Sequence, residues 1–280
     1  MATITNIDSL RTLAGLSKSQ QAISKASERL STGYQINRAS DNPGMTAVAN
    51  DLKTQLTSYS QILTNVSQGK ATTSLVDASL TKMVDLLGYM RVAAVAAQTS
   101  TLTTSERTAY QSAINAYVTA FDTIGTNTTW NGTSLMSTTA TMNVQTGVNS
   151  GNTTTLTFSK MTTSELSVDS LSTASTTTAA TAVTAIDAAI KLVNVYQTYM
   201  GAMKNVMDSQ ATVATNAITS YSAAYGAIMN TDYAAETAKL AAAQIQHDGA
   251  TAMLIQGNGL NRALVDYLLG GPSTYAPRAM

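Results

Sequence analysis

The stretch Glu28–Met45, ERLSTGYQINRASDNPGM, is a polar, turn-rich passage between two segments that have the residue pattern of helices. Gly33 can end the first helix, because glycine readily adopts the positive φ that a helix C-terminus often needs. Asn42 and Pro43 can begin the next helix, as N-cap and as first helical residue. The stretch is therefore predicted to connect an N-terminal helix to a separate helical bundle.

A long apolar seam follows this connector. Its residues recur at alternating steps of three and four, and no proline interrupts them. This is the pattern of a coiled coil, and at about 1.5 Å per residue it predicts a rod of about 80 Å. The seam consists of Met45, Val48, Leu52, Gln55, Tyr59, Ile62, Val66, Gly69, Thr73, Val76, Leu80, Met83, Leu87, Met90, Ala94 and Ala97. Gln55, Gly69 and Thr73 are its weak positions.

Two further seams complete the predicted bundle, which has two long helices and one shorter helix. The methionines on the seams, such as Met83, Met90, Met200 and Met207, are expected to pack in the core. The short seam is Tyr110, Ile114, Tyr117, Phe121 and Ile124. The second long seam is Val183, Ile186, Ile190, Val193, Gln197, Met200, Lys204, Met207, Ala211, Ala214, Ile218, Tyr221, Tyr225 and Ile228.

The segment between these seams has a different pattern. Apolar residues alternate around Met142 and Val144 and again around Leu156 and Phe158, with a Gly/Asn-rich turn between the two runs. Such alternation, with threonines at the exposed positions, predicts a β-hairpin. The expected fold class is mainly α, an elongated coiled-coil bundle with a small β-hairpin insert and paired N- and C-terminal helices.

The two ends of the chain carry lean apolar stripes that are expected to pair. Asp232 is a plausible N-cap for the C-terminal helix. Marginal amphipathic helices of this kind become ordered when something packs against them, so a subunit with two layers is predicted. The stripes are Leu13, Leu16, Ile23, Ala26 and Leu30 at the front, and Leu240, Ile245, Leu254, Leu260, Leu264 and Leu268 at the back.

The predicted organisation divides the chain into six parts. They are an N-terminal helix and connector (1–42), rod helices (43–125), a β-hairpin region (126–178), a rod helix of the C-terminal half (179–231), a helix at the C-terminal end (232–269) and a flexible tail (270–280).

Composition excludes several functional classes. The formal net charge is zero, so the chain has no electrostatic footprint for nucleic acid. It has no cysteine, its one histidine is His247, and no catalytic or phosphate-binding motif is present. We therefore expect no enzyme activity, no metal site and no cofactor. Neither a signal peptide nor an apolar window that approaches a membrane span is expected.

Four stretches resemble bacterial flagellin, in the same order along the chain. The stretch ERLSTGYQINRASDNPGMTAVANDL resembles the N-terminal signature of that family. LTTSERTAYQSAINAYVTAFDTIGTNTTWNGTSLM is similar to its helix, short loop and FNG passage, here with Trp130 before Asn131 and Gly132. MNVQTGVNSGNTTTLTF resembles the core β-hairpin of the family, and DYAAETAKLAAAQIQHDGATAMLIQGN resembles its C-terminal passage. The resemblance covers residues 1 to about 269.

This resemblance implies an extracellular subunit that self-assembles into the flagellar filament for motility. It implies a short, core-only member without large outer domains, which is exported unfolded by the flagellar type III apparatus. The implied partners are identical copies, an export chaperone, and cap and hook-junction proteins, with no nucleic acid and no membrane insertion. The residues expected at the self-assembly interface are Leu13, Leu16, Ile23, Leu30, Ile36, Asn37, Arg38, Asp41, Asn42, Arg91, Leu254, Leu260, Leu264 and Leu268.

The chain departs from the family pattern in the rod. Where many flagellins have RMRELA, this sequence has GYMRVAAVA, which keeps Arg91 but has Val92 and Ala93 in place of Glu and Leu. Recognition by the animal flagellin receptor is therefore not expected.

The nearest alternative is the hook–filament junction protein of the same superfamily. A cytoplasmic signalling coiled coil and a filament-borne hydrolase are further alternatives, but the first gives no reason for the hairpin and the second needs a catalytic insert.

Overall fold

The computed structural model describes residues 7–268 of the 280-residue chain, and these form two compact units. One unit contains the described residues up to Lys53 and from Ser222 onward, and the other is Thr54–Tyr221. The helices are α1 (Ile7–Thr32), α2 (Pro43–Ala96), α3 (Thr104–Asn127), α4 (Thr176–Met229) and α5 (Tyr233–Leu268). The strands are β1 (Thr129–Trp130), β2 (Thr133–Ser134), β3 (Ala140–Gln145) and β4 (Thr153–Phe158). The predicted mainly α fold with a hairpin insert is confirmed.

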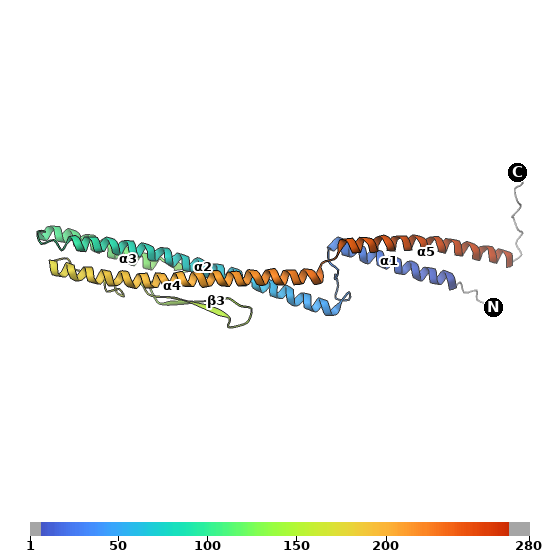
Figure 1. The fold of residues 1–280 in the computed structure, drawn as a ribbon, viewed down its shortest axis with the longest axis horizontal. Helices are drawn as coiled ribbons and strands as arrows, with labels where there is room; N and C mark the ends of the chain where they lie inside the picture. The colour runs from blue at the N-terminus through green and yellow to red at the C-terminus, as the bar shows by residue number, and fades with distance from the viewer. Residues whose placement is uncertain (1–6, 269–280) are drawn as a thin grey trace, which may run out of the picture. The chain divides into compact units, whose positions relative to one another are not determined.

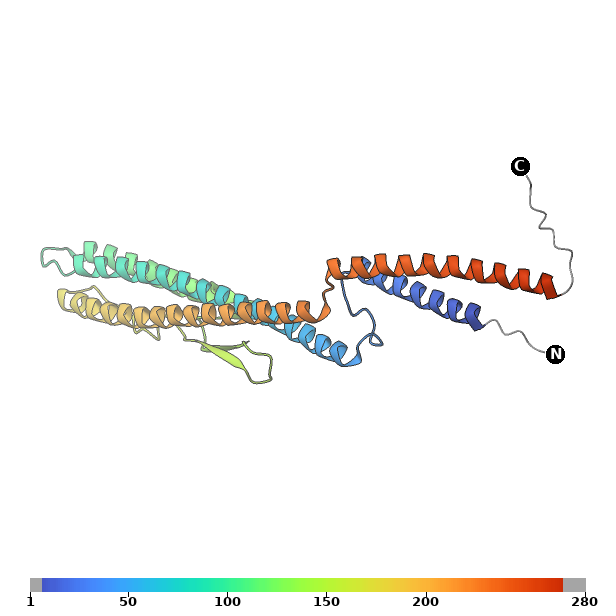
Figure 2. The same ribbon diagram turned by 45° about the vertical axis from the view of Figure 1, so that its right-hand side comes forward.

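The core of the second unit lies where α2, α3 and α4 run side by side (Figures 1 and 2). The predicted α2 seam is buried at every position from Ile62 to Ala97, but not before them: Met45 and Val48 are exposed, and Leu52, Gln55 and Tyr59 are half-buried. Each fully buried Leu, Val or Met side chain contributes about 1.5–3 kcal/mol relative to an exposed one. This seam therefore contributes substantially to the stability of the bundle. Its fully buried large residues are Val66, Val76, Leu80, Met83, Leu87 and Met90.

The buried face of α4 differs in part from the predicted seam. Ile186, Val193, Met200 and Met207 are buried, as expected. Between these residues, each predicted seam position lies one residue too far along the chain. The buried residues are Ala182, Ala189 and Tyr196, whereas the predicted Val183, Ile190 and Gln197 are only half-buried. The physical reason is that α4 packs against the β-hairpin as well as the other helices, so its apolar face is wider than a coiled-coil seam.

The β3–β4 hairpin is antiparallel, with Met142 opposite Leu156 and Val144 opposite Thr154. Val144, Leu156 and Phe158 are buried and join the core of the helical bundle. The predicted hairpin is therefore confirmed, and its apolar side packs against the helices instead of facing solvent.

Two tyrosines of α4 hold the outer edge of β4. The backbone N–H of Ser159 donates to the hydroxyl of Tyr196 at 2.8 Å, and that of Thr157 donates to the hydroxyl of Tyr199 at 3.4 Å. The two rings stack with centroids 6.1 Å apart. Because an unpaired strand edge can recruit another strand, these hydroxyls both anchor the hairpin and protect part of its edge. Burial raises the pKa of Tyr196 to about 12.

A second, smaller hairpin was not predicted. Strands β1 and β2 pair across the two residues Asn131 and Gly132, which have φ of 49° and 78°. Asn-Gly is the preferred sequence for a two-residue turn in which both residues have positive φ. The signal was present in the sequence, but sequence analysis used it only as part of a family resemblance.

Arg107 closes the turn between α2 and α3. Its buried guanidinium donates to the backbone carbonyls of Ala97 and Thr99, the latter at 2.7 Å. Helix C-termini leave carbonyls without intrahelical partners, so an arginine from the next helix supplies the missing donors. A capping box between Thr103 and Glu106 begins α3.

The expectation that no window approaches a membrane span is too strong for α4. An 18-residue window of this helix reaches a mean hydropathy of 1.3, which suffices for a span by length and composition alone. Only 28 % of that window is buried, although α4 as a whole buries Ile186, Val193 and Met200 in the bundle.

Candidate functional site

The connector begins and ends as its sequence predicts. Gly33 has φ of 75° directly after α1, and its N–H donates to the carbonyl of Arg29 at 2.9 Å. Asn42 Oδ1 accepts the N–H of Met45 at 3.2 Å, which caps the start of α2. Asp232 Oδ1 accepts the N–H groups of Ala234 and Ala235 at 2.9 and 3.1 Å, so it is the N-cap of α5.

The outgoing and returning parts of the chain are joined beside the connector. The N–H of Gln35 donates to the carbonyl of Met229 at 2.7 Å, and its side-chain amide donates to the carbonyl of Ile228 at 2.5 Å. The N–H of Thr231 donates to the carbonyl of Gly33 at 2.9 Å. The two crossings therefore form a short antiparallel ladder rather than two independent loops, a detail that sequence analysis did not predict.

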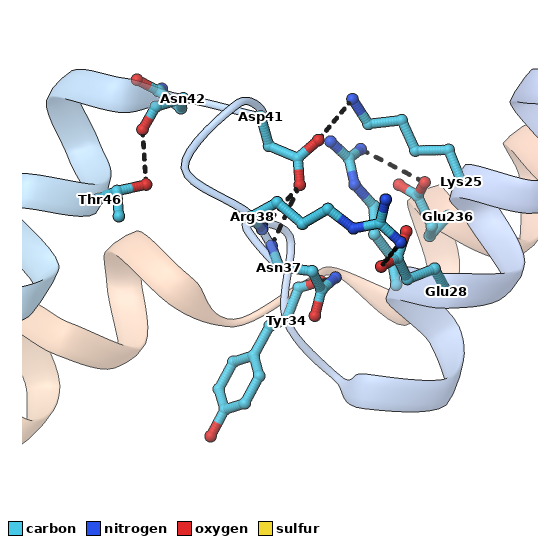
Figure 3. A network of polar contacts seen from close by, with 10 residues as sticks. Lys25, Glu28, Tyr34, Asn37, Arg38, Asp41, Asn42, Thr46 and Glu236 are labelled. Carbon is cyan, nitrogen blue, oxygen red and sulfur yellow. Dashed lines mark hydrogen bonds and ion pairs between the residues drawn. The ribbon is translucent and has the colours of Figure 1, made fainter.

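Asp41 is the centre of the connector (Figure 3). Its Oδ2 accepts the backbone N–H groups of Asn37 and Arg38 at 3.2 and 3.1 Å, and its Oδ1 lies 3.0 Å from Lys25 Nζ. The bond from Lys25 and the two backbone bonds lower the pKa of Asp41, because all of them favour the carboxylate. Asp41 therefore ties the loop to itself and to α1.

The other predicted connector residues have separate roles. Figure 3 shows Arg38 reaching Glu28, and its guanidinium lies 3.1 Å from that carboxylate at an exposed position. The Asn37 side chain donates to the carbonyl of Tyr34 at 3.0 Å. The structure therefore brings Asn37, Arg38 and Asp41 together, whereas Asn42 caps α2. Ile36 is buried beside them.

A buried ion pair between α1 and α5 was not predicted. Glu236 is only 4 % exposed, and its carboxylate lies 3.4 Å from Arg29 Nη1 and 2.9 Å from Lys239 Nζ. Burial works to raise the pKa of Glu236, but Lys239 and Arg29 outweigh it, so the pKa lies below its ordinary value. No local sequence signal pairs Glu236 with a residue that precedes it by 207 positions.

Small side chains form the contact between α1 and α5, which lie side by side in both views (Figures 1 and 2). Ser19, Ala26 and Ala243 are buried there. Four of the predicted interface residues, Leu16, Ile23, Leu30 and Leu254, are half-buried, and Leu13 and Leu260 are exposed. The side chains of Leu264 and Leu268 lie outside those described, as does the whole 270–280 segment.

The outward side of α5 carries large apolar side chains. Ile245, Met253 and Leu260 are 73, 67 and 67 % exposed. They are spaced by eight and seven residues, close to two helical turns, so they share one face of the helix. Exposed apolar patches of this kind mark interaction sites in native proteins.

Arg91, the last of the predicted interface residues, belongs to the other unit. Its guanidinium lies 2.6 Å from a carboxylate oxygen of Asp187. The structure therefore places Arg91 in an ion pair between α2 and α4, and does not group it with the residues of the terminal helix pair.

A helical bundle with a terminal pair that exposes apolar side chains is typical of a structural protein. Within residues 7–268, no three His, Asp or Glu side chains come together in a way that could hold a metal ion. The comparison with known families agrees with this class. The chain belongs to the bacterial flagellin family: it matches the bacterial flagellin N-terminal helical region over residues 4–141 and the C-terminal helical region over residues 183–268. Residues 142–182 separate the two matches, and they contain most of the β3–β4 hairpin, the segment that follows it and the first turns of α4.

Individual relatives match over part of their length. The flagellin of Salmonella dublin is 29 % identical over 222 residues, which are 78 % of this chain and 44 % of the relative. Flagellin A of Helicobacter pylori is 32 % identical over 133 residues, which are 48 % of this chain and 26 % of the relative. The chain thus spans less than half the length of these curated relatives.

Two solved structures have the same fold. The crystal structure of Bacillus cereus flagellin matches with a TM-score of 0.50 and 24 % identity, over 54 % of this chain and 88 % of that one. A putative flagellar hook-associated protein from Vibrio parahaemolyticus matches with a TM-score of 0.57 and 16 % identity, over 68 % and 99 %. At these identities the likeness describes the fold alone.

Proposed function

We propose that this chain is a structural subunit of the bacterial flagellar filament, outside the cell, and that it polymerises through the terminal helix pair. The outward face of α5 carries this proposal. Ile245, Met253 and Leu260 are exposed there, whereas α1 covers only the small-residue face of α5. Because burying each such side chain contributes about 1.5–3 kcal/mol, a second copy that covers this face stabilises both the polymer and the helix pair.

The rest of the predicted interface supports this arrangement in two ways. Leu13 on α1 is an exposed apolar contact of the same kind as Leu260. The connector residues Asn37, Arg38 and Asp41 set the geometry between the terminal pair and the start of α2 through the network around Asp41. A connector held in place by the hydrogen bonds and ion pair around Asp41 allows copies to join at a defined angle.

Export in an unfolded state by the flagellar type III apparatus also fits this fold. The terminal pair buries small side chains and one ion pair, so little free energy opposes its unfolding before transport. The same weakness discourages polymerisation before export, because the outward faces are well ordered only when copies meet. An export chaperone, a cap protein and junction proteins are the partners that this role requires.

Introducing a negative charge on the outward face tests self-assembly. Ile245→Asp and Leu260→Asp each place a carboxylate where a neighbouring copy packs, and they should abolish filaments in salt-induced polymerisation viewed by electron microscopy. Gln244→Asp is the matched control, because it adds the same charge at an exposed position about 100° around the helix. It should polymerise like the unchanged protein.

Circular dichroism of each unassembled variant controls for folding, since the bundle of Thr54–Tyr221 should stay helical. If Ile245→Asp and Leu260→Asp both form filaments of normal length, the outward face of α5 is not an assembly contact.

The hook–filament junction is the second candidate, because the chain also has the fold of a putative hook-associated protein. Abundance separates the two roles. Mass spectrometry of sheared filaments should find a filament subunit as the major component, whereas a junction protein would appear only in trace amounts.

A further inference from the structure

The methionines of this chain differ sharply in exposure. Met253 is 67 % exposed on the outward face of α5, and Met45 is 46 % exposed in the first turn of α2. Five methionines of the bundle are fully buried, namely Met83, Met90, Met136, Met200 and Met207. Thioether oxidation requires contact with the oxidant, and it follows exposure. Within residues 7–268, the structure therefore separates two exposed methionines, Met45 and Met253, from a group that is protected from oxidants.

The surroundings of Met253 leave its sulfur open. The residues one turn before and after it on the same side of α5 are Gly249, Ala250, Gln256 and Gly257. A Cβ added at Gly249 would meet no other atom within 4 Å. Met253 thus projects from a stretch of α5 that has small or uncharged neighbours, on the same face as Ile245 and Leu260.

We propose that Met253 is a reversible oxidation site, modified by hypohalous acids, that prevents an oxidised subunit from joining the polymer. This inference rests on the proposed function, since the outward face of α5 must be an assembly contact. In the reaction, the sulfur lone pair forms the new S–O bond while the O–Cl bond of hypochlorous acid breaks. Chloride leaves with the bonding electrons, and a proton is released. Sulfur is oxidised by two electrons and chlorine is reduced by two.

The product changes the face from apolar to polar. A sulfoxide carries a strong hydrogen-bond acceptor, and burying such a group without a donor is unfavourable. Because Met253 lies between Ile245 and Leu260 on the face that a neighbouring copy covers, its oxidation should raise the critical concentration for polymerisation about tenfold, the equivalent of about 1.4 kcal/mol. Subunits already in the polymer are protected, because the neighbour covers the sulfur.

The first measurement is made on unassembled protein and does not depend on polymerisation. The full chain is treated with one to two equivalents of hypochlorous acid, and the oxidised methionines are located by peptide mass mapping. Among the methionines of residues 7–268, Met253 should be modified most and Met45 next, with the five fully buried methionines unmodified. Equal modification of buried and exposed methionines, or an unmodified Met253, would overturn the inference.

The second measurement compares the critical concentrations of treated and untreated protein by sedimentation. Treated protein should require about tenfold more subunit, and methionine sulfoxide reductase should restore the untreated value. Met253→Leu should polymerise normally and resist the treatment, whereas Met45→Leu should stay sensitive. Met253→Gln imitates the polar sulfoxide and should polymerise poorly without any oxidant.

The outcomes separate the inference from the proposed function. If untreated protein does not polymerise, self-assembly itself is wrong. If untreated protein polymerises and treated protein does so equally well, or if Met253→Leu remains as sensitive as the unchanged protein, the oxidation site is wrong and self-assembly stands.

Discussion

Gly69 of α2 lies directly under Val144 of β3. A Cβ built at Gly69 would come within 2.9 Å of Val144 Cγ2 and 3.2 Å of Met207 Sδ. Gly69 is a weak position of the α2 seam because it has no side chain. At this position the Val144 side chain of the hairpin packs against the helix instead. The missing side chain on the helix is replaced by one from the strand.

Gly69→Ala should destabilise the bundle by about 1–3 kcal/mol, because a methyl group forced into a packed core moves its neighbours. Gly88→Ala is the matched control in the same helix, since a Cβ at Gly88 meets nothing within 4 Å. It should be neutral or stabilising by about 0.5–1 kcal/mol, because alanine favours a helix over glycine. Urea unfolding of both variants measures the difference, and equal midpoints would contradict this packing.

Tyr196→Phe should loosen the hairpin. The variant removes the hydroxyl that accepts the Ser159 N–H at 2.8 Å, and an unsatisfied buried donor costs about 1–3 kcal/mol. Tyr199→Phe should cost less, because its bond to the Thr157 N–H is longer, at 3.4 Å. Hydrogen exchange of the β4 amides reports the change. If the two variants exchange alike, the Tyr196 hydroxyl does not anchor the strand.

The stability of the bundle should fall at alkaline pH through the same tyrosine. Burial raises the pKa of Tyr196 from 10.0 to about 12, so the unfolded chain releases this proton first. The contribution is fully present below pH 10 and is lost as the pH rises toward 12. Unfolding measured between pH 9 and pH 12 should show a smaller loss in Tyr196→Phe than in the unchanged protein.

The connector should loosen in acid. The pKa of Asp41 is lowered from 3.8 in the folded protein, so the stability that it contributes is present above the unfolded value and is lost as the pH falls through the folded value. Amide exchange at Asn37 and Arg38 should therefore accelerate below about pH 4 relative to the intrinsic rate. Asp41→Asn should show the faster exchange already at neutral pH, and unchanged protection there would exclude Asp41 as the centre of the connector.

Glu236→Gln should weaken the pairing of α1 with α5. The change removes the charge between Arg29 and Lys239, and hydrogen bonds to charged groups contribute about 1.5–3 kcal/mol. Lys239→Gln is the control, because its side chain is largely exposed and an exposed pair contributes at most about 1 kcal/mol. Hydrogen exchange along α1 is the measurement. A larger effect from Lys239→Gln would show that Arg29 is not the important partner.

Local sequence signals predicted the helix ends and the hairpin correctly. Gly33, Asn42 and Asp232 act within a few residues of themselves, so their roles could be deduced without knowing the fold. The buried part of the α2 seam was predictable for the same reason, because the spacing of its apolar residues indicates which side of the helix faces the core. The interface residues of the terminal helices remain a prediction, because assembly needs a second copy.

Apart from the β1–β2 hairpin, whose Asn131–Gly132 turn signal was local, the main errors and omissions concern contacts between distant segments. The buried face of α4 includes Tyr196 because a hairpin about forty residues earlier lies on it, and periodicity within α4 contains no record of that neighbour. The Glu236–Arg29 pair arises in the same way. Such contacts depend on which elements pack against each other, and the packing of the whole unit decides this.

The tip of the β3–β4 hairpin has a practical consequence for engineering. Residues Asn149, Ser150, Gly151 and Asn152 are exposed, while the two strands behind them are held by Gly69 and the tyrosine pair. Foreign peptides are best tolerated at exposed turns whose flanks are firmly anchored. This loop is therefore the natural position at which to graft an epitope, so that a polymer of these chains would present it in a dense, regularly repeated array.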